Sequence, residues 1–236
     1  MDDGFLERER QRIEDMKGYE HDACRSGARY IAGIDEAGRG PIAGPVVAAA
    51  VILPPDFFLP RVDDSKKVAA QHRSQLAAAI KKEAVAWSIV SVNPPCLDRI
   101  NILNATREAM RIAVLHLTPP ADFLLIDAVK LSDINIRQRS IIKGDSLSVS
   151  IACASILAKV ERDNKMEAYE DIYPGYGFAR HKGYATREHL EAIAKIGICP
   201  IHRASFEPVK SILSGGNYGE QPGLFDQDYV EYKHSG

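Results

Sequence analysis

Residues 30–54 read YIAGIDEAGRGPIAGPVVAAAVILP, and this stretch contains two segments that predict strands. Its first six residues predict a strand that ends in acid at Asp35. Residues 46–53 form a continuous run of valine, isoleucine, leucine and alanine, which predicts a strand buried on both faces. Pro54 and Pro55 end that second strand, because proline cannot donate a hydrogen bond to a sheet. The fold therefore starts with two strands that a glycine-rich turn separates.

Outside this stretch, apolar spacing predicts amphipathic helices and further short strands. Thr186 is expected to cap one helix at its N-terminus, and Gly197 is expected to end it. Strands and helices that do not alternate strictly indicate an α/β fold with a mixed sheet. The expected helices cover 5–20, 69–83, 97–117, 148–172, 186–196 and 206–213, and the further strands cover 84–92, 123–127 and part of 134–143.

The charge of the chain is unevenly distributed along its 236 residues. The net charge of −2 excludes a generally polybasic protein, but it does not exclude nucleic-acid binding, which depends on where the charge lies. Residues 1–29 carry 8 acidic and 6 basic side chains, and residues 217–236 carry 4 and 1. Residues 30–216 carry 20 acidic and 23 basic side chains, so acidic ends flank a mildly basic middle.

We expect three parts: an N-terminal helical extension over 1–29, one domain over 30–213 and a flexible acidic tail over 214–236. The four cysteines include no CxxC pair, which argues against a zinc knuckle or a redox motif. The chain has no apolar run of about 18 residues and no apolar N-terminus of the signal-peptide kind. We therefore expect a cytoplasmic protein.

Four acidic residues follow apolar segments, where the ends of strands in α/β sheets commonly bind ligands. They are Asp35 and Glu36 after YIAGI, Asp127 after FLLI, and Asp145 in IIKGDS. Poorly solvated carboxylates that converge repel one another, and a hard divalent cation such as Mg²⁺ relieves that repulsion. Adjacent strand residues point to opposite faces, so Asp35 and Glu36 can share a metal only if the strand ends or bulges between them. Taken alone, Glu36 also fits an exposed turn residue and Asp127 a cap.

Gly38, Arg39 and Gly40 follow the first strand and predict a turn whose backbone can approach a phosphate or a sugar closely. The spacing GxGxxxG, with Pro41 inside it and a strand after it, excludes a dinucleotide-binding fingerprint. A plain tight turn is the alternative interpretation.

Basic residues beside apolar segments provide candidate phosphate contacts, although each taken singly also fits a solvated surface. Lys66, Lys143 and Arg180 belong to this group. Tyr184, after a glycine in a basic loop, is a candidate stacking residue.

Several motifs, in order from about residue 30 to residue 213, resemble bacterial ribonuclease HII. They are the opening stretch, DDSKK, LLIDAVK, IIKGDS, SIACASILAKVERD, YGFARHKGYATREHL and HRASFEPVK. The resemblance implies a ribonuclease H-like fold, in which helices flank a mixed sheet and a helical segment follows at the C-terminus. It also implies an endoribonuclease that cleaves the RNA strand of RNA–DNA hybrids and nicks duplex DNA 5′ to a single ribonucleotide. Ala128 departs from the glycine that many members carry after the aspartate.

The resemblance assigns roles to the candidate residues. Asp35, Glu36, Asp127 and Asp145 would be the catalytic acids that hold two Mg²⁺ or Mn²⁺ ions. The Gly38–Gly40 turn would read the ribose 2′-hydroxyl at the RNA–DNA junction. Tyr184 would stack on the next deoxynucleotide sugar, while Lys66, Lys143 and Arg180 would contact phosphates.

Two alternative functions and one further partner remain open from the sequence. A ribonuclease HIII-like nuclease would share the acidic site, although that family usually carries an added N-terminal domain. A non-catalytic nucleic-acid-binding module would use the acids as caps. Residues 221–225, QPGLF, resemble the short peptide that binds bacterial DNA polymerase sliding clamps, with Gln221, Leu224 and Phe225 as the matching residues. The family resemblance implies a monomer.

Overall fold

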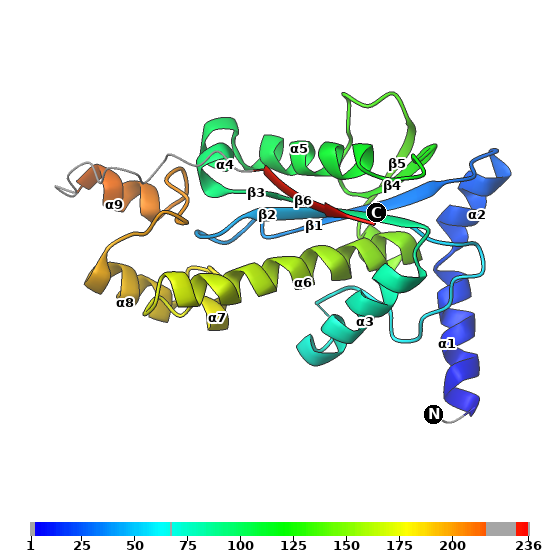
Figure 1. The fold of residues 1–236 in the computed structure, drawn as a ribbon, viewed down its shortest axis with the longest axis horizontal. Coiled ribbons are helices and arrows are strands. Elements are labelled where there is room, and N and C mark those ends of the chain that lie inside the picture. The colour runs from blue at the N-terminus through cyan, green and yellow to red at the C-terminus, as the bar shows by residue number, and fades with distance from the viewer. Residues whose placement is uncertain (1–2, 67, 216–229, 236) are drawn as a thin grey trace.

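The computed structural model describes residues 3–66, 68–215 and 230–235, and it is organised around one six-stranded mixed sheet (Figure 1). The strand order is β5-β4-β1-β2-β3-β6. Strands β1, β2, β3 and β6 pair antiparallel, whereas β4 and β5 run parallel to β1. This arrangement confirms the predicted mixed sheet. The strands are β1 Ile31–Ala37, β2 Val46–Ile52, β3 Ala86–Val92, β4 Phe123–Asp127, β5 Arg137–Ile141 and β6 Val230–His234.

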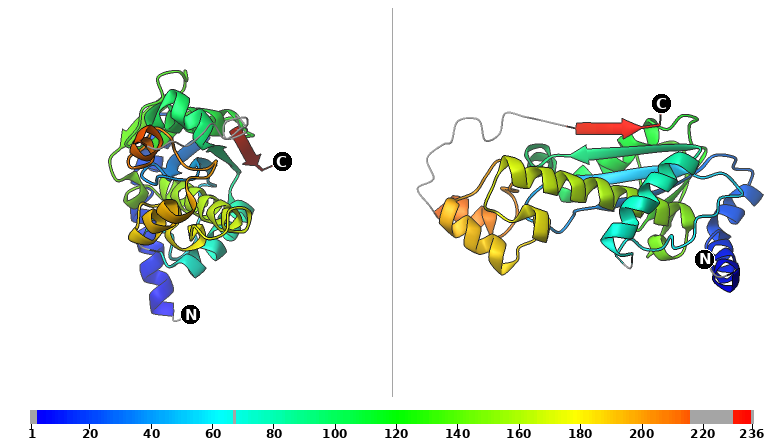
Figure 2. Two further views of the ribbon diagram at one scale, coloured as in Figure 1. Left: turned by 90° about the vertical axis from the view of Figure 1, so that its left-hand side faces the viewer. Right: turned by 60° about the horizontal axis from the view of Figure 1, so that its bottom comes forward.

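Helices cover both faces of the sheet (Figures 1 and 2). Helices α4 Pro94–Ile100 and α5 Ile102–Leu115 lie on one face, and α3 Ala70–Glu83 and α6 Val149–Ile172 lie on the other. The remaining helical segments are α1 Asp3–Asp15, α2 Gly18–Arg25, the short η1 Gly144–Ser146, α7 Phe178–His181, α8 Arg187–Ile196 and α9 Val209–Gly215. Helices α7, α8 and α9 extend from the end of the molecule opposite to α1. None of the helices in the described residues has the length and apolar character needed to cross a membrane.

The central strand β2 is buried on both faces, as its apolar run predicted. Val46, Ala48, Ala50 and Ile52 pack in the apolar cluster under α5. The alternate residues of the same strand pack in a second cluster with α6 and α3. The two-residue alternation of a strand therefore divides one hydrophobic run between two cores.

Helix α6 lies unusually close to β1, and Gly33 makes this approach possible. A Cβ atom on Gly33 would lie 2.1 Å from the backbone carbon of Ser150 and 2.4 Å from the backbone nitrogen of Ile151. No real side chain tolerates such contacts with backbone atoms. Ser148 starts the helix, because its hydroxyl accepts a hydrogen bond from the Ile151 N–H at 3.3 Å. Helix α6 is thus fixed directly over the strand that carries the candidate acids.

The N-terminal segment is part of this packing. The single helix expected over 5–20 is instead two helices, α1 and α2, and Ile13 and Met16 are buried near their junction. Glu20 of α2 accepts hydrogen bonds from the Ser148 and Ser150 hydroxyls at 2.6 Å and from the Ser150 N–H at 3.0 Å. A carboxylate at a helix N-terminus also interacts favourably with the helix dipole. The extension therefore completes the start of α6.

One further helix prediction differs from the structure, and another is confirmed. The helix expected over 97–117 is divided between α4 and α5 at Asn101, which has a φ of 65°. The Asn101 side chain accepts a hydrogen bond from the Asn104 N–H at 3.1 Å and so starts the second helix. For α8 the predicted boundaries are confirmed, since Thr186 accepts from the His189 N–H and Gly197 ends the helix with a φ of 81°.

The C-terminal segment was expected to be a flexible tail over 214–236, and this is wrong for residues 230–234. They form β6, which pairs antiparallel with β3 at the edge of the sheet. Lys233 and Glu231 point toward α6, where they pair with Glu161 at 2.8 Å and Lys165 at 2.5 Å. The sheet edge and these two pairs hold the segment in place. The clamp-like peptide at 221–225 lies outside the described residues.

We predict that Gly33→Ala destabilises the protein by at least roughly 3 kcal/mol, the range of severe core overpacking. The added methyl group has no space between β1 and α6, so one of the two backbones must move. Gly18→Ala is the matched control, since a Cβ there meets nothing within 4 Å. Urea unfolding of both variants measures the difference. An unchanged unfolding midpoint in Gly33→Ala would contradict the close approach.

Candidate functional site

Asp35 and Glu36 lie on an unbroken strand, which corrects one expectation. The register of β1 against β2 runs without interruption through Asp35↔Ala49, Glu36↔Ala48 and Ala37↔Val47. There is no bulge between the two acids, so their side chains leave opposite faces of the sheet. Asp35 shares the face of Gly33 and points toward α6. The expectation that the two acids can approach one site only after a break in the strand is therefore wrong, because the strand is continuous and the charges of Glu36 and Asp127 still act on Asp35.

Asp35 is buried with polar neighbours that can accommodate a carboxylate. It is 5% exposed, and its Oδ1 accepts a hydrogen bond from the Glu36 N–H at 2.7 Å. Ser155 of α6 is a second hydrogen-bonding neighbour. Burial raises the pKa of Asp35 well above its ordinary value, and repulsion from Glu36 and Asp127 raises it further. The carboxylates of Asp35, Glu36 and Asp127 are therefore close enough to repel one another.

Glu36 is under a similar electrostatic strain. Burial raises its pKa, and the charge of Asp127 adds to the effect although Arg39 opposes it. The Arg39 guanidinium lies 3.5 Å from Glu36 Oε1. The other carboxylate oxygen, Oε2, is buried without a hydrogen-bond partner among the described residues. A buried oxygen of this kind needs a cation or a donor that the protein itself does not supply.

Asp127 and Asp145 are joined through the short η1 turn. Asp127 follows the residue that pairs with Ile34, which places it beside Asp35 in the parallel register. Its Oδ1 accepts a hydrogen bond from the Gly144 N–H at 2.8 Å, and Asp145 is the next residue. Burial raises the pKa of Asp145, and the neighbouring Asp64 raises it further. The four predicted acids therefore belong to one electrostatically connected group.

Asp64 is a member of this group that the sequence reasoning missed as an acid. It interacts with Asp145 directly, and Lys66 lies 3.5 Å from Asp145 Oδ2 and 3.9 Å from Asp64 Oδ1. Asp64 belongs to the DDSKK motif, but the sequence interpretation used only the lysines of that motif.

These carboxylates suit a hard divalent cation that keeps some of its bound water molecules. All the donors are carboxylate oxygens, which Mg²⁺ and Mn²⁺ prefer. In the part of the chain that the structure describes, no three His, Cys, Asp or Glu side chains form a ready-made metal-ligand group. Mg²⁺ is commonly held by one or two carboxylates together with waters and substrate phosphate oxygens, so a closed protein cage is not required. The raised pKa values and the orphaned Glu36 oxygen both fit such an ion.

The Gly38–Gly40 turn lies beside the acids and against Tyr184. Gly38 has a φ of 93°, and a Cβ there would lie 2.0 Å from Arg162 Nε. A Cβ on Gly40 would lie 3.6 Å from Cε1 of the Tyr184 ring, which is 49% exposed. Two motifs more than 140 residues apart in the chain therefore lie close together.

A groove with a volume of about 420 Å³ connects these elements. Most of its polar lining is basic or hydroxylic, with Glu36 at the acidic end. The lining includes Glu36, the Gly38–Gly40 turn, Ser65, Lys66, Ser155, Lys159, Arg162 and Tyr184. This composition is suited to a phosphate-rich ligand.

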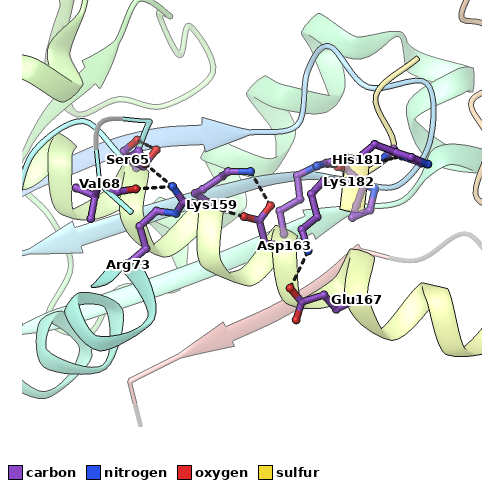
Figure 3. Close-up of polar contacts among 12 residues, drawn as sticks. Ser65, Val68, Arg73, Lys159, Asp163, Glu167, His181 and Lys182 are labelled. Carbon is purple, nitrogen blue, oxygen red and sulfur yellow. Dashed lines mark hydrogen bonds and ion pairs between the residues drawn. The ribbon is translucent and has the colours of Figure 1, made fainter. Parts of the chain in front are cut away.

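The loop that carries Lys66 is anchored to α6 by Arg73, which the sequence reasoning did not single out (Figure 3). Arg73 donates to the carbonyls of Ser65 at 2.9 Å and Val68 at 2.6 Å. Asp163 of α6 lies 3.6 Å from Arg73 and accepts a hydrogen bond from Lys159 at 2.6 Å. Arg73 thereby fixes the loop that Lys66 extends from.

Two of the three predicted phosphate contacts, Lys143 and Arg180, do not line the groove. Lys143 is exposed with a φ of 59° next to the η1 turn. Arg180 pairs with Glu188 of α8 and does not line the groove. The structure brings Lys66 to the acids but leaves Arg180 engaged elsewhere.

Ala128, which follows Asp127, has a φ of 51°. This left-handed conformation favours glycine, because a Cβ costs about 1–2 kcal/mol there. The alanine is therefore tolerated at some cost in backbone strain next to a candidate acid.

Comparison with known proteins identifies relatives for most of the chain. The family model described as ribonuclease HII matches residues 32–209. A ribonuclease HII of Syntrophomonas wolfei subsp. wolfei is 65% identical over 222 residues, which cover 94% of this chain and 87% of that protein.

Solved structures are similar as well. The crystal structure of ribonuclease H2 from Pyrococcus horikoshii OT3 has a TM-score of 0.66 at 24% identity and covers 79% of this chain and 98% of that one. The ribonuclease HII of Archaeoglobus fulgidus, solved in a complex with PCNA, has a TM-score of 0.65 at 28% identity and covers 76% and 96%.

We predict that Asp35→Asn stabilises the metal-free protein at neutral pH. The pKa of Asp35 is raised in the folded state, so ionisation opposes folding once the pH exceeds the ordinary aspartate value. An increase in Tm of at least roughly 2 °C at pH 7, about 1 kcal/mol for a chain of this size, is expected in EDTA. The gain should shrink as the pH falls and vanish well below about 4, where Asp35 is protonated in both the folded and the unfolded state.

Asp163→Asn is the control for this prediction. Asp163 pairs with Lys159 and lies near Arg73, so its loss should lower the Tm. A lower Tm for Asp35→Asn at pH 7 would contradict the repulsion among the acids.

Proposed function

Because this chain belongs to the ribonuclease HII family, we propose that it nicks duplex DNA 5′ to a single embedded ribonucleotide, in addition to cleaving RNA–DNA hybrids. The family itself establishes a ribonuclease H endonuclease that acts on RNA–DNA hybrids. The alternative of a non-catalytic binding module is therefore wrong. The ribonuclease HIII alternative is not supported, since the matching model and the 65% identical relative are both ribonuclease HII. Its substrate class leads us to place the protein in the cytoplasm.

The observation that carries the proposal is the position of the acidic group next to a groove with basic and hydroxyl side chains, which Glu36 also lines. Asp35, Glu36, Asp127 and Asp145 would hold two Mg²⁺ or Mn²⁺ ions, and Asp64 would support Asp145. When bound, such ions lower the pKa of a water molecule and stabilise the leaving 3′ oxygen, which gives 5′-phosphate and 3′-hydroxyl ends. The burial and mutual repulsion of Asp35 and Glu36 favour occupancy by a cation.

The residues of the groove would orient the substrate. The Gly38–Gly40 turn would place backbone N–H groups and the Arg39 side chain at the ribonucleotide, where the 2′-hydroxyl distinguishes RNA from DNA. Tyr184 would stack on the neighbouring deoxyribose, and its contact with Gly40 supports this arrangement. Lys66 would attract the phosphate backbone next to the acids, and Lys143 would contact phosphate from the edge of the η1 turn. Arg180 would reach a phosphate only after leaving Glu188.

We predict that Asp35→Asn lowers cleavage at least roughly 100-fold, the scale seen when a key electrostatic group is removed, while hybrid binding persists. The substrates are a duplex with one ribonucleotide, a long RNA–DNA hybrid and the matching all-DNA duplex, each in Mg²⁺ and in Mn²⁺. Gel mapping should place the wild-type cut 5′ to the ribonucleotide. Asp171→Asn, the same substitution at an exposed residue near the end of α6, is the control. Retained activity of Asp35→Asn in Mg²⁺ would overturn the assignment.

A sliding clamp is proposed as a protein partner. The support is the QPGLF sequence at 221–225, together with the Archaeoglobus fulgidus relative that was solved in a complex with PCNA. An extended peptide with two adjacent apolar anchors suits a groove on a partner protein.

We predict that the double variant Leu224→Ala/Phe225→Ala loses capture by an immobilised bacterial sliding clamp, because both anchors are removed. Tyr218→Ala, an apolar truncation in the same segment outside the motif, should retain capture. Cleavage of a short free duplex should be equal in all three proteins. Equal clamp binding by the double variant would exclude this motif as the docking peptide.

A further inference from the structure

The adjacent residues His202 and Arg203 join the two elements that flank the groove. They lie between α8 and α9 and form a short bridge with residues 42–44. The Arg203 N–H donates to the Ile42 carbonyl at 2.9 Å, and the Gly44 N–H donates to the Ile201 carbonyl at 2.8 Å. The bridge fixes these two distant segments against each other.

Arg203 binds the backbone carbonyls of the Gly38–Gly40 turn. The side chain is fully buried, and its guanidinium donates to the carbonyls of Gly38 at 2.6 Å, Arg39 at 3.0 Å and Gly44 at 2.9 Å. Burial lowers the pKa of Arg203 to about 9, so the group keeps its charge at neutral pH. A buried charge of this kind is costly unless its donors are satisfied, and here backbone carbonyls satisfy them.

The orientation of these carbonyls has a consequence for the opposite side of the turn. In a trans peptide the C=O and the following N–H point in opposite directions. Because the Gly38 and Arg39 carbonyls point at Arg203, the N–H groups of Arg39 and Gly40 point away from it. Gly38, Arg39 and Gly40 line the groove, whereas Arg203 does not. Arg203 thereby directs two backbone donors toward the groove.

His202 acts on the other element, Tyr184, through His189. The Cys199 N–H donates to His202 Nδ1 at 2.9 Å, which leaves the His202 proton on Nε2. That Nε2 lies 3.1 Å from His189 Nε2, which must therefore accept. His189 then carries its proton on Nδ1 and donates to the Tyr184 carbonyl at 2.8 Å. One chain of hydrogen bonds fixes both tautomers and ends at Tyr184.

Both histidines remain neutral around physiological pH. Burial lowers the pKa of each to about 4. A second proton on either ring would place two donors face to face, so the neutral forms and the hydrogen-bond chain support each other. The His181 ring stacks on the His189 ring, with 4.3 Å between the two ring centroids.

We propose that His202–Arg203 is a positioning element that sets Tyr184 against the Gly38–Gly40 turn and so tunes the recognition of a single ribonucleotide. This inference rests on the proposed function of those two elements. It assigns no contact with substrate to His202 or Arg203. It requires that a change at either residue displaces the groove without removing any group that lines it.

Substitutions at His202 and Arg203 distinguish loss of their hydrogen bonds toward Tyr184 and the glycine turn from general destabilisation of the fold. His202→Asn keeps an acceptor near the Nδ1 position for Cys199 but cannot reach His189. His202→Gln extends its amide N–H to the Nε2 position and preserves the donor to His189. Arg203→Lys keeps the charge but cannot span three carbonyls. Ile193 is buried in an apolar cluster with Cys199 and Ile201, next to His202. Ile193→Val removes buried volume there without changing a hydrogen bond of His202 or Arg203, and it controls for simple destabilisation.

The first readout is NMR of ¹³C-labelled tyrosine in the free protein. We expect the Tyr184 ring resonances to shift in His202→Asn and to stay near wild type in His202→Gln and Ile193→Val. Unchanged Tyr184 resonances in His202→Asn would overturn the proposal, whichever substrates the wild type cuts. This measurement does not depend on activity, so it remains decisive if the proposed nicking fails.

The second readout is the ratio of kcat/KM for a single-ribonucleotide duplex to that for a long hybrid, measured on one preparation. We expect His202→Asn and Arg203→Lys to lower the kcat/KM on the single ribonucleotide roughly 10- to 100-fold, as small misplacements do. The loss should fall mainly on kcat, because duplex phosphates dominate binding.

A double-mutant cycle completes the test. If His202 acts through Tyr184, His202→Asn should add little to the defect of Tyr184→Ala. Fully additive defects, or equal loss on both substrates in His202→Asn, would show a general structural role and contradict the proposal. A wild type that cuts hybrids but never nicks at a single ribonucleotide would instead refute the proposed function.

Discussion

The contact of helix α6 with strand β1 at Gly33 is the constraint on which the rest of the molecule depends. With no side chain at this position, the helix backbone lies directly on the strand. The same two elements then come together along their length, with Ser155 beside Asp35 and Arg162 beside Gly38. A bulkier residue at 33 would separate the acids from the groove, because both are supported by α6.

The site places charges of opposite sign side by side. Buried carboxylates repel one another at the end of β1, whereas the buried guanidiniums of Arg162 and Arg203 behind the glycine turn are held by backbone carbonyls. Arg162 donates to the carbonyls of Ala43 and Pro45 at 3.1 Å, and burial lowers its pKa to about 10. The carboxylates favour the binding of metal ions, and the neighbouring basic residues favour the binding of phosphates. The net charge of −2 conceals this separation, since residues 30–216 carry +7 once the four acids are set aside.

The ends of the chain are structural parts of the domain in the described residues. Glu20 completes the N-terminus of α6, the helix that organises the site. At the other end, β6 covers the edge of β3 and pairs with α6 through Lys165 and Glu161. Strand β6 is itself the edge of the sheet, and its charged residues Glu231 and Lys233 disfavour pairing of that edge with other chains.

Much of the fold follows from local properties of the chain. Alternation and helical spacing predicted the two central strands and α8 with its cap, and the structure confirms them. The position of acids after apolar strands made Asp35, Glu36, Asp127 and Asp145 the candidate metal ligands, and the family resemblance supplied the expected roles of Tyr184 and the glycine turn. Long-range contacts in the folded chain show that Asp35 and Glu36 leave opposite faces of a continuous strand, that Asp64 joins the acids, that Glu188 engages Arg180, and that residues 230–234 form a strand. They also reveal His202 and Arg203 behind the groove. These features depend on contacts between residues far apart in the chain, and local periodicity carries no information about which distant side chain neutralises a charge or satisfies a carbonyl.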